Sequence, residues 1–406
     1  MSTANPLNEE NALSSESINE PPQTAKTFIA KHHDHSSLDT WFTNLLSKAD
    51  ITVNGPNPWD PQLHNPNLWS RVLKQGSLGL GEAYMDGWWD CQQIDEFIRR
   101  IINAELDKII TGRWTLIRHW LKATLFNRQS VKRAYQVGEQ HYDVGNDLYQ
   151  AMLDESMAYS CGYWKEADTL HQAQLNKLRL ICEKAQLNKA ESVVEIGCGW
   201  GSFAEIAARE YEVNVTGVTI SKEQEKLAKE RCKGLPVDIK LMDYRSLEGQ
   251  YDKAVSIGMF EHVGPKNYGT YMQTAHNLIK EDGIFVLHTI GSDKSATGTD
   301  PWIDKYIFPN GVIPTLTQIS ESAEPYFVIE DVHNFGQDYA TTLLAWHSNF
   351  EKAWPQLQNQ YSERFYRMWT YYLKVCAAAF QSRSLQLYQV VLRKRLTPLE
   401  RYHSPR

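Results

Sequence analysis

The spacing of hydrophobic residues follows two different patterns along the chain, and the change of pattern divides the chain into two regions. Between Leu38 and Ala134, apolar residues recur at spacings of three and four, as in "LDTWFTNLLSKA" and "IDEFIRRIINAEL", which is typical of amphipathic helices. From Ser192 onwards, short apolar runs such as "SVVEI", "VNVTGVTI", "KAVSI" and "GIFVLHTIG" alternate with helical stretches. This alternation predicts a mostly parallel sheet with helices on both faces.

The end of the chain breaks this alternation. Two strand patterns, "YFVIEDVHNF" and "SLQLYQVVLR", are separated by two helical stretches, and this order predicts an antiparallel last strand. The expected fold class is therefore α/β, with a smaller and mainly helical N-terminal domain.

The remaining segments set the expected domain boundaries. Residues 1–36 are polar and poor in large apolar residues, which predicts a disordered tail. We expect a helical domain over residues 37–134 and a catalytic domain over residues 135–406. Within the helical part, "GSLGLGEAYMDGWWD" is rich in glycine but follows no strand, so it indicates a turn packed by Trp88 and Trp89 rather than a phosphate loop.

Composition narrows the class of protein. The 406 residues are 42% hydrophobic and 22% charged, as in ordinary globular proteins, and the formal net charge of -7 argues against a nucleic-acid binder. The six cysteines form no CxxC pair and the polar N-terminus has no apolar signal core, so we expect reduced thiols in a cytoplasmic protein. No apolar run approaches the ~20 residues that span a bilayer, so an action on lipid would occur at the membrane surface.

One segment is basic, although the chain as a whole has a negative net charge. From Lys108 to Gly138 the chain has seven Lys or Arg residues and no Asp or Glu, interleaved with Trp114, Trp120 and several leucines. Basic and aromatic residues together on a helix suit an anionic membrane surface. A core helix with a solvated basic face is the alternative.

A glycine loop follows the first strand of the sheet. "VVEIGCGWG" has the spacing G-x-G-x-G, tighter than the G-x-G-x-x-G of dinucleotide folds, and it resembles the S-adenosylmethionine loop of class I methyltransferases. Most such enzymes place an acid after the second strand to bind the ribose. Here that position reads Thr219-Ile220-Ser221, so Gln224 or these hydroxyls must serve instead.

The stretch "GMFEHVG" places a carboxylate at the end of an apolar run. Glu261 has three readings in this position: a metal ligand, a general base, or the holder of another group that acts as base. A fourth reading is a helix cap. We expect no metal, because Glu261 and His262 are adjacent and point apart, and no third ligand follows at a helical spacing.

With these motifs, the chain resembles the bacterial cyclopropane-fatty-acyl-phospholipid synthases. The matching stretches include "GSLGLGEAYMDGWW", "HYDVGNDLY", "YSCGYW", "EIGCGWG", "GVTISKEQ", "GMFEHVGPKNY", "KYIFPNG" and "HNFGQDYATTLLAW". The resemblance implies that a methylene group from S-adenosylmethionine is added across the cis double bond of an unsaturated phospholipid acyl chain, with bound bicarbonate as base. It also implies two partners: the inner face of the cytoplasmic membrane, contacted peripherally, and a second copy of the chain in a homodimer.

The resemblance also assigns the site residues. The implied cofactor positions are Tyr159, Ser160, Val193, Val194, Glu195, Ile196, Gly197, Cys198, Gly199, Trp200, Gly201, Thr219, Ile220, Ser221, Lys222, Glu223, Gln224, Tyr244 and Arg245. The implied catalytic and bicarbonate positions are Cys161, Glu261, His288, Ile290, Tyr339 and Cys376. Two alternative functions are methyl branching of lipid acyl chains, and methylation of a small molecule on the same fold.

The basic segment generates a first prediction. Replacing Arg113, Arg118 and Lys122 with Glu should weaken binding to anionic vesicles and phospholipid turnover together, because each basic group near such a surface contributes about 1 kcal/mol. Cofactor affinity should barely change, and added salt should mimic the substitutions because exposed charges are screened beyond roughly 10 Å at 0.1 M. Vesicle flotation measures this. A triple variant that floats as well as the wild type would mean that the lipid contact lies elsewhere.

Overall fold

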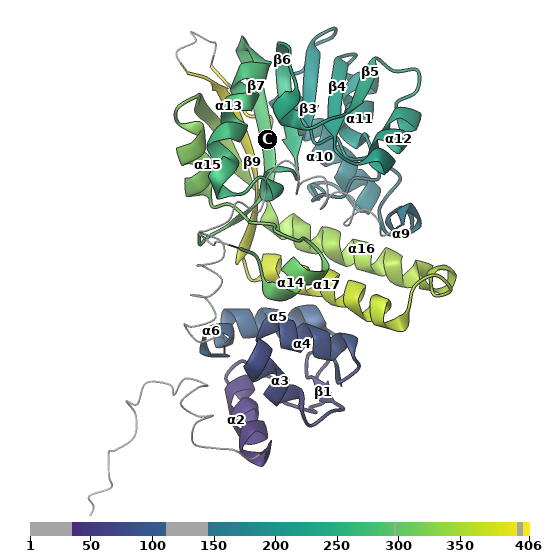
Figure 1. Ribbon diagram of the computed structural model, residues 1–406, viewed down its shortest axis with the longest axis vertical. Helices are drawn as coiled ribbons and strands as arrows, with labels where there is room; N and C mark the ends of the chain where they lie inside the picture. Colours follow the sequence, from purple (N-terminus) through teal and green to yellow (C-terminus); the bar gives the residue numbers. More distant parts are fainter. Residues whose placement is uncertain (1–34, 111–144, 296–297, 396–400) are drawn as a thin grey trace, which may run out of the picture.

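The computed structural model describes residues 35–110, 145–295, 298–395 and 401–406 (Figure 1). Its first helix, α2, runs over His35–Ser47, so the last two residues assigned to a disordered tail are helical instead. The rest of that tail, the boundary near residue 135, and the basic segment beyond Ile110 lie outside the described residues, and the corresponding expectations stay predictions. Within the described part, no helix has the length and apolar character needed to cross a bilayer.

A seven-stranded sheet forms the larger part of the molecule, in the order β5-β4-β3-β6-β7-β9-β8. Its strands are β3 (Ser192–Ile196), β4 (Asn214–Thr219), β5 (Val237–Leu241), β6 (Tyr251–Ile257), β7 (Ile279–Ser292), β8 (Phe327–Asn334) and β9 (Leu385–Lys394). Strands β3 to β7 pair in parallel, whereas β9 runs antiparallel to both β7 and β8. The predicted α/β class, including its antiparallel last strand, is confirmed.

Helices cover both faces of this sheet because successive strand residues point to opposite sides. Val193 packs in one core with residues of α10 (Leu170–Lys184) and α11 (Ser202–Glu210). Its neighbour Val194 packs in another core with residues of α13 (Tyr268–Leu278) and α15 (Leu316–Ala323). Helix α12 (Lys222–Arg231) follows β4. The loops that leave the carboxyl ends of β3, β4, β5 and β6 are therefore free to surround a ligand.

The N-terminal helices share one core with late helices of the chain. These N-terminal elements are α2, α3 (Leu68–Gln75), α4 (Ser77–Met85), α5 (Ile94–Asn103) and α6 (Leu106–Ile110), with the short strands β1 (Gln62–Leu63) and β2 (Trp89–Asp90). Their buried residues join those of α9 (Asn146–Met152), α16 (Gly336–Leu357) and α17 (Glu363–Gln381) in a continuous cluster. Figure 1 shows α16 and α17 between the sheet and the N-terminal helices.

The prediction of a turn over "GSLGLGEAYMDGWWD" was wrong for Ser77–Met85, which form α4. Glycine is unfavourable inside a helix, but here it allows close packing. A Cβ atom on Gly81 would lie 2.5 Å from Cδ1 of Trp302 and 2.8 Å from Cε1 of Tyr371. The glycines therefore bring α4 against α14 (Pro301–Tyr306) and α17. The expected packing by Trp89 is confirmed, since this side chain is fully buried.

A cluster of polar groups around Glu82 joins α4 to α14. The Glu82 carboxylate accepts hydrogen bonds from Lys305 Nζ at 2.6 Å, from the Tyr306 hydroxyl at 2.8 Å, and from Arg71 at 2.8 Å. Burial alone would raise the pKa of Glu82, but the hydrogen bonds from Lys305 and Arg71 outweigh it and lower this pKa to about 2. Helix α14 leads directly into residues 307–312, which reach the functional pocket described next.

Candidate active site

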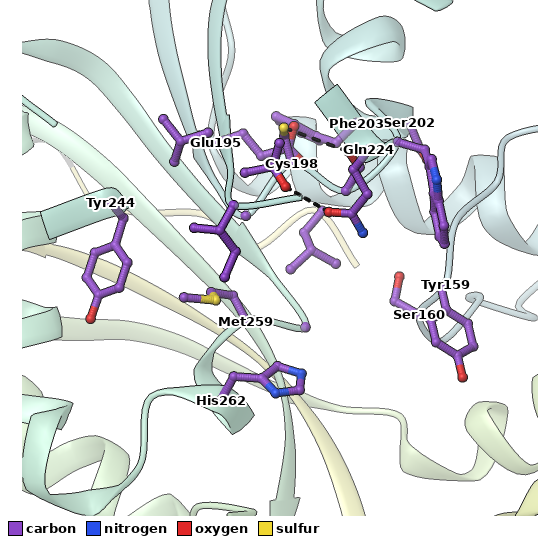
Figure 2. A pocket seen from close by; sticks show the side chains of 18 of the residues that line it. Tyr159, Ser160, Glu195, Cys198, Ser202, Phe203, Gln224, Tyr244, Met259 and His262 are labelled. Carbon is purple, nitrogen blue, oxygen red and sulfur yellow. Dashed lines mark hydrogen bonds between the residues drawn. The ribbon is translucent and has the colours of Figure 1, made fainter. Parts of the chain in front are cut away.

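A pocket lies at the carboxyl ends of four parallel strands (Figure 2). Its walls include Gly197 to Trp200 after β3, Thr219 and Ile220 after β4, Met242 to Arg245 after β5, and Gly258 and Met259 after β6. Ligands of open parallel sheets bind at this edge, where the loops separate. The four strands thus build the pocket that the glycine-loop motif predicts.

The glycine loop has the backbone conformation that its sequence requires. Gly197, Gly199 and Gly201 have φ angles of 84°, 52° and 84°, in the left-handed region that favours glycine. A Cβ atom on Gly199 would meet nothing within 4 Å, so this position faces open space. The loop ends at Gly201, and α11 starts at Ser202. Its backbone therefore leaves room for close approach of a ligand to a helix N-terminus.

Thr219 and Gln224 replace the acid that most such folds carry after the second strand. The Thr219 hydroxyl donates to Gln224 Oε1 at 2.8 Å, which turns the Gln224 amide nitrogen toward the pocket (Figure 2). An acid is supplied one strand later by Asp243, which sequence reasoning did not single out. It is bound to the Arg245 side chain at 2.6 and 2.8 Å, and its pKa is lowered by this partner despite burial. The motif "MDYR" is the signal that could have identified it.

The opposite wall comes from the segment between α9 and α10. Tyr159 and Ser160 lie there, across the pocket from Tyr244 (Figure 2). The Tyr159 hydroxyl lies 2.8 Å from that of Tyr372 on α17. The residues of the wall that sequence reasoning missed include Lys177, Met259, His262, Pro309 and Asn310.

Several implied cofactor residues support the pocket without lining it. Val193, Val194 and Ile196 are fully buried in the cores on either side of β3. Ser221 caps α12 by accepting a hydrogen bond from the Gln224 backbone N–H. The side chains that do line the pocket among those expected are Tyr159, Ser160, Glu195, Cys198, Trp200, Thr219, Ile220, Gln224, Tyr244 and Arg245. Gly201, Lys222 and Glu223 belong to the supporting set as well, at the starts of α11 and α12.

A second, buried polar cluster lies around Glu261. Glu261 Oε1 accepts a 2.7 Å hydrogen bond from the Ile290 backbone N–H, which rules out the reading of this residue as a helix cap. Its other oxygen, Oε2, is buried and has no hydrogen-bond partner among the described residues. Burial raises the pKa of Glu261 to about 7, although the Ile290 hydrogen bond opposes the shift. Ile290 therefore orients Glu261, and Oε2 remains as an acceptor.

His288 faces the same cluster as a neutral ring. Burial holds the pKa of His288 well below its ordinary value, so both nitrogens are not protonated together. Gln389 Nε2 lies 3.2 Å from His288 Nδ1. When this amide donates to Nδ1, the ring hydrogen is on Nε2, which is buried and without a partner in the described part of the chain. The cluster thus offers a donor in His288 Nε2 and an acceptor in Glu261 Oε2.

Cys161 and Tyr339 complete this cluster. Cys161 is fully buried and packs with Phe335, Leu387, Ile290 and Tyr339. Burial, with Cys161 and Glu261 nearby, raises the pKa of the Tyr339 hydroxyl well above its ordinary value, so it remains a neutral donor. Cys376 lies on α17 close to Tyr339, and burial raises the pKa of its thiol to about 12. A thiol with this pKa is not a thiolate nucleophile near neutral pH.

The pocket and the buried cluster are adjacent, because two segments contribute to both. Ser160 lines the pocket while Cys161, the next residue, lies in the cluster. In the same way, His262 lines the pocket while Glu261 belongs to the cluster. A ligand in the pocket would therefore lie next to the buried polar cluster around Glu261.

Comparison with known proteins identifies a family of enzymes to which this chain is similar. Residues 129–390 match the family model described as mycolic acid cyclopropane synthetase. The chain belongs to this family. It is 54% identical over 356 residues to the cyclopropane-fatty-acyl-phospholipid synthase of Escherichia coli (strain K12), covering 87% of this chain and 93% of that protein. It is 31% identical over 379 residues to the tuberculostearic acid methyltransferase UfaA1 of Mycobacterium tuberculosis, covering 86% and 87%.

Solved structures of the family share the fold. The cyclopropane synthase MmaA2 from Mycobacterium tuberculosis matches with a TM-score of 0.60 and 28% identity, over 64% of this chain and 97% of that one. The mycolic acid cyclopropane synthase CmaA1, complexed with SAH and CTAB, matches with the same TM-score and identity, over 64% and 98%. This member of the cyclopropane synthetase family is an S-adenosylmethionine-dependent methyltransferase.

The raised pKa of Glu261 generates a prediction about stability. A carboxyl group whose pKa is higher in the folded than in the unfolded state destabilises the fold as pH rises between the two values, here from about 4.5 to about 7. Glu261→Gln removes this loss. The variant should therefore gain stability relative to the wild type, by on the order of 2 kcal/mol, when pH is raised from 5 to 8.

Urea unfolding of both proteins at the two pH values measures the difference. Glu248→Gln, at an exposed site, is the matched control and should show no such gain. An equal stability difference at pH 5 and pH 8 would mean that Glu261 titrates normally in the folded protein.

Proposed function

We propose that this enzyme adds a methylene group from S-adenosylmethionine across the cis double bond of unsaturated acyl chains in membrane phospholipids, with bicarbonate as the base. The observation that carries the proposal is the buried cluster beside the cofactor pocket, with Glu261 Oε2 and His288 Nε2 both without partners among the described residues. The 54% identity to a cyclopropane-fatty-acyl-phospholipid synthase supports the choice of substrate.

The pocket suits the cofactor at both of its ends. Gln224 and the glycine loop offer N–H donors, and Thr219, Tyr244 and Asp243 surround the region after β4 and β5. S-adenosylmethionine, when bound, supplies an electrophilic carbon for an alkene. An alkene has no proton to remove beforehand, so no side chain is needed to activate it. The chain's task is to align the reactants and to exclude water.

The buried cluster suits bicarbonate, which when bound would supply a small base. Its O–H has an acceptor in Glu261 Oε2, and its oxygens have donors in His288 Nε2 and the Tyr339 hydroxyl. The Ile290 N–H is already used by Glu261, so the role of Ile290 is to orient the carboxylate. Glu261 thereby holds the base. Bicarbonate is small, whereas a side chain that removed the proton itself would crowd the acyl chain.

Aromatic rings form the wall that links the pocket to the cluster. Trp346 lies 5.2 Å from Tyr159 of the pocket and 6.0 Å from Tyr339 of the cluster, between ring centroids. Phe308 and Tyr372 are 5.9 Å apart on the same side. Such rings exclude water and stabilise positive charge on the acyl chain by roughly 0.5–2 kcal/mol for each well-placed ring.

The partners are part of the same proposal. An acyl chain embedded in a bilayer requires the enzyme to hold the membrane, which we expect to be the inner face of the cytoplasmic membrane, in a peripheral manner. We also expect a homodimer, which light scattering can test.

A second candidate function is methyl branching of acyl chains. The 31% identity to a tuberculostearic acid methyltransferase favours it. Incubation with unsaturated phospholipid vesicles and S-adenosylmethionine separates the two. Mass spectrometry would detect the gain of one CH2 group, and proton NMR of the recovered lipid would distinguish a cyclopropane ring from a branch.

The proposed base generates a prediction about carbonate. Stripping carbonate from the buffer should slow turnover, and adding bicarbonate back should restore the rate. Glu261→Gln should lose most activity because an amide cannot accept the same hydrogen bond as strongly, while S-adenosylmethionine still binds. Turnover by the wild type that is unchanged in carbonate-free buffer would contradict the role of bicarbonate.

The high pKa of Cys376 generates another prediction. Cys376→Ser should keep measurable activity, because a protonated thiol outside the proton path does not take part in the chemistry. A lipid assay, together with cofactor binding to confirm folding, measures the outcome. An inactive variant that folds and binds cofactor would give this thiol a chemical role.

A further inference from the structure

Two buried side chains of α10 converge on Ser160. The Lys177 Nζ donates to the Ser160 hydroxyl at 2.9 Å, and Gln174 Nε2 donates to the Ser160 carbonyl at 2.8 Å. Lys177 is 1% exposed and Gln174 is 0% exposed. Burying a lysine and a glutamine is costly unless their polar groups are used. Together they fix both the backbone and the side chain of one pocket residue.

The hydrogen bond from Lys177 determines what Ser160 can do. Because the Ser160 oxygen accepts from an ammonium group, its own O–H remains to be donated elsewhere. Ser160 and Lys177 both line the pocket. A hydroxyl polarised by a neighbouring cation is a good donor to an anion, since hydrogen bonds that involve charge are the stronger ones.

The buried Glu195 carboxyl group lies near this lysine: burial raises the pKa of Glu195 well above its usual range, and Lys177 opposes that shift. Glu195 lines the same pocket, is 2% exposed, and has one oxygen, Oε2, without a partner in the described part of the protein. Burial lowers the pKa of Lys177 to about 8, while Asp154, Cys161 and Glu195 oppose this shift. The lysine therefore remains largely protonated near neutral pH.

The two ends of the pocket thus differ in chemistry. On the side of Tyr244, Asp243 is paired with Arg245 and Thr219 with Gln224, which suits the neutral hydroxyl and amino groups of a nucleoside. Near Ser160, the Lys177 ammonium group and the Glu195 carboxyl group both line the pocket. This pair matches a zwitterion, and the amino-acid end of S-adenosylmethionine is one.

We propose that Lys177 and Gln174 are positioning residues that orient Ser160 as the hydroxyl donor for the α-carboxylate of S-adenosylmethionine. The inference rests on the binding of this cofactor in the pocket, and does not depend on the acyl substrate or on bicarbonate. Lys177 acts through Ser160, so its loss affects ligands that carry the carboxylate and spares those that lack it.

Calorimetric titration with two ligands tests this. S-adenosylhomocysteine carries the carboxylate, and its decarboxylated analogue, 5′-S-(3-aminopropyl)-5′-thioadenosine, keeps the nucleoside and the amine. Lys177→Met should weaken S-adenosylhomocysteine binding about tenfold or more and change binding of the analogue less than about twofold. Unchanged binding of the analogue also demonstrates that the variant pocket is folded.

Lys184→Met is the matched control. Lys184 lies on the same helix, is likewise fully buried, and contacts His333 rather than the pocket. It should leave the ratio of the two affinities unchanged. Ser160→Ala should reproduce the selective loss, and the double variant should be no weaker than Ser160→Ala alone, because both residues act through one hydroxyl.

Several results would overturn the inference. Equal weakening of both ligands by Lys177→Met would make this lysine a structural residue of the pocket, and no weakening would remove it from recognition. Additive losses in the double variant would contradict action through Ser160. If Lys177→Met does not fold, Ser160→Ala decides by the same ligand comparison. A wild type that fails to bind S-adenosylhomocysteine would instead contradict the assignment of the pocket to the cofactor.

Discussion

The hydrogen bond from the Ile290 amide to Glu261 is the interaction on which the catalytic arrangement depends. It exists because β6 and β7 pair in parallel, with Ile257 opposite His288, so that Glu261, just after β6, meets Ile290, two residues farther along β7. A carboxylate buried this deeply is costly unless it is held. The sheet register fixes one oxygen of Glu261 and leaves the other, like Nε2 of His288, buried and without a partner among the described residues.

Neighbouring residues of two short segments separate the cofactor pocket from the buried polar cluster. Ser160 and His262 face the cofactor pocket, and their neighbours Cys161 and Glu261 face the dry cluster. Adjacent residues of extended backbone point to opposite sides, and adjacent residues of the 3-10 helix that holds Glu261 and His262 differ in direction by about a third of a turn. Two short segments therefore contribute neighbouring residues to the cofactor pocket and to the buried cluster. The rings of Trp346, Tyr159 and Tyr339 lie between the two sites.

The sheet could be predicted from sequence because buried strands carry their own signal in short apolar runs. The pocket motifs were also readable, since glycine spacing and strand ends are local features. Helix α4 was not, because three glycines in and before it hide the helical period, and one of them, Gly81, packs against Trp302 more than 200 residues away. Lys177 was missed for a similar reason: on its helix it reads as a surface lysine, and only the fold buries it against Ser160.

The contacts of Glu82 tie the first hundred residues to the reacting centre. Glu82 holds α14, the loop after α14 reaches Val312, and the Val312 N–H donates to the Glu261 carbonyl at 3.0 Å. The region matched by the family begins only at residue 129, so Glu82 and α4 lie outside it, whereas α14, Val312 and Glu261 lie within it. The N-terminal helices are therefore not freely exchangeable: a protein engineer who replaces them with another domain would also have to rebuild the contacts that hold α14 and, through Val312, Glu261.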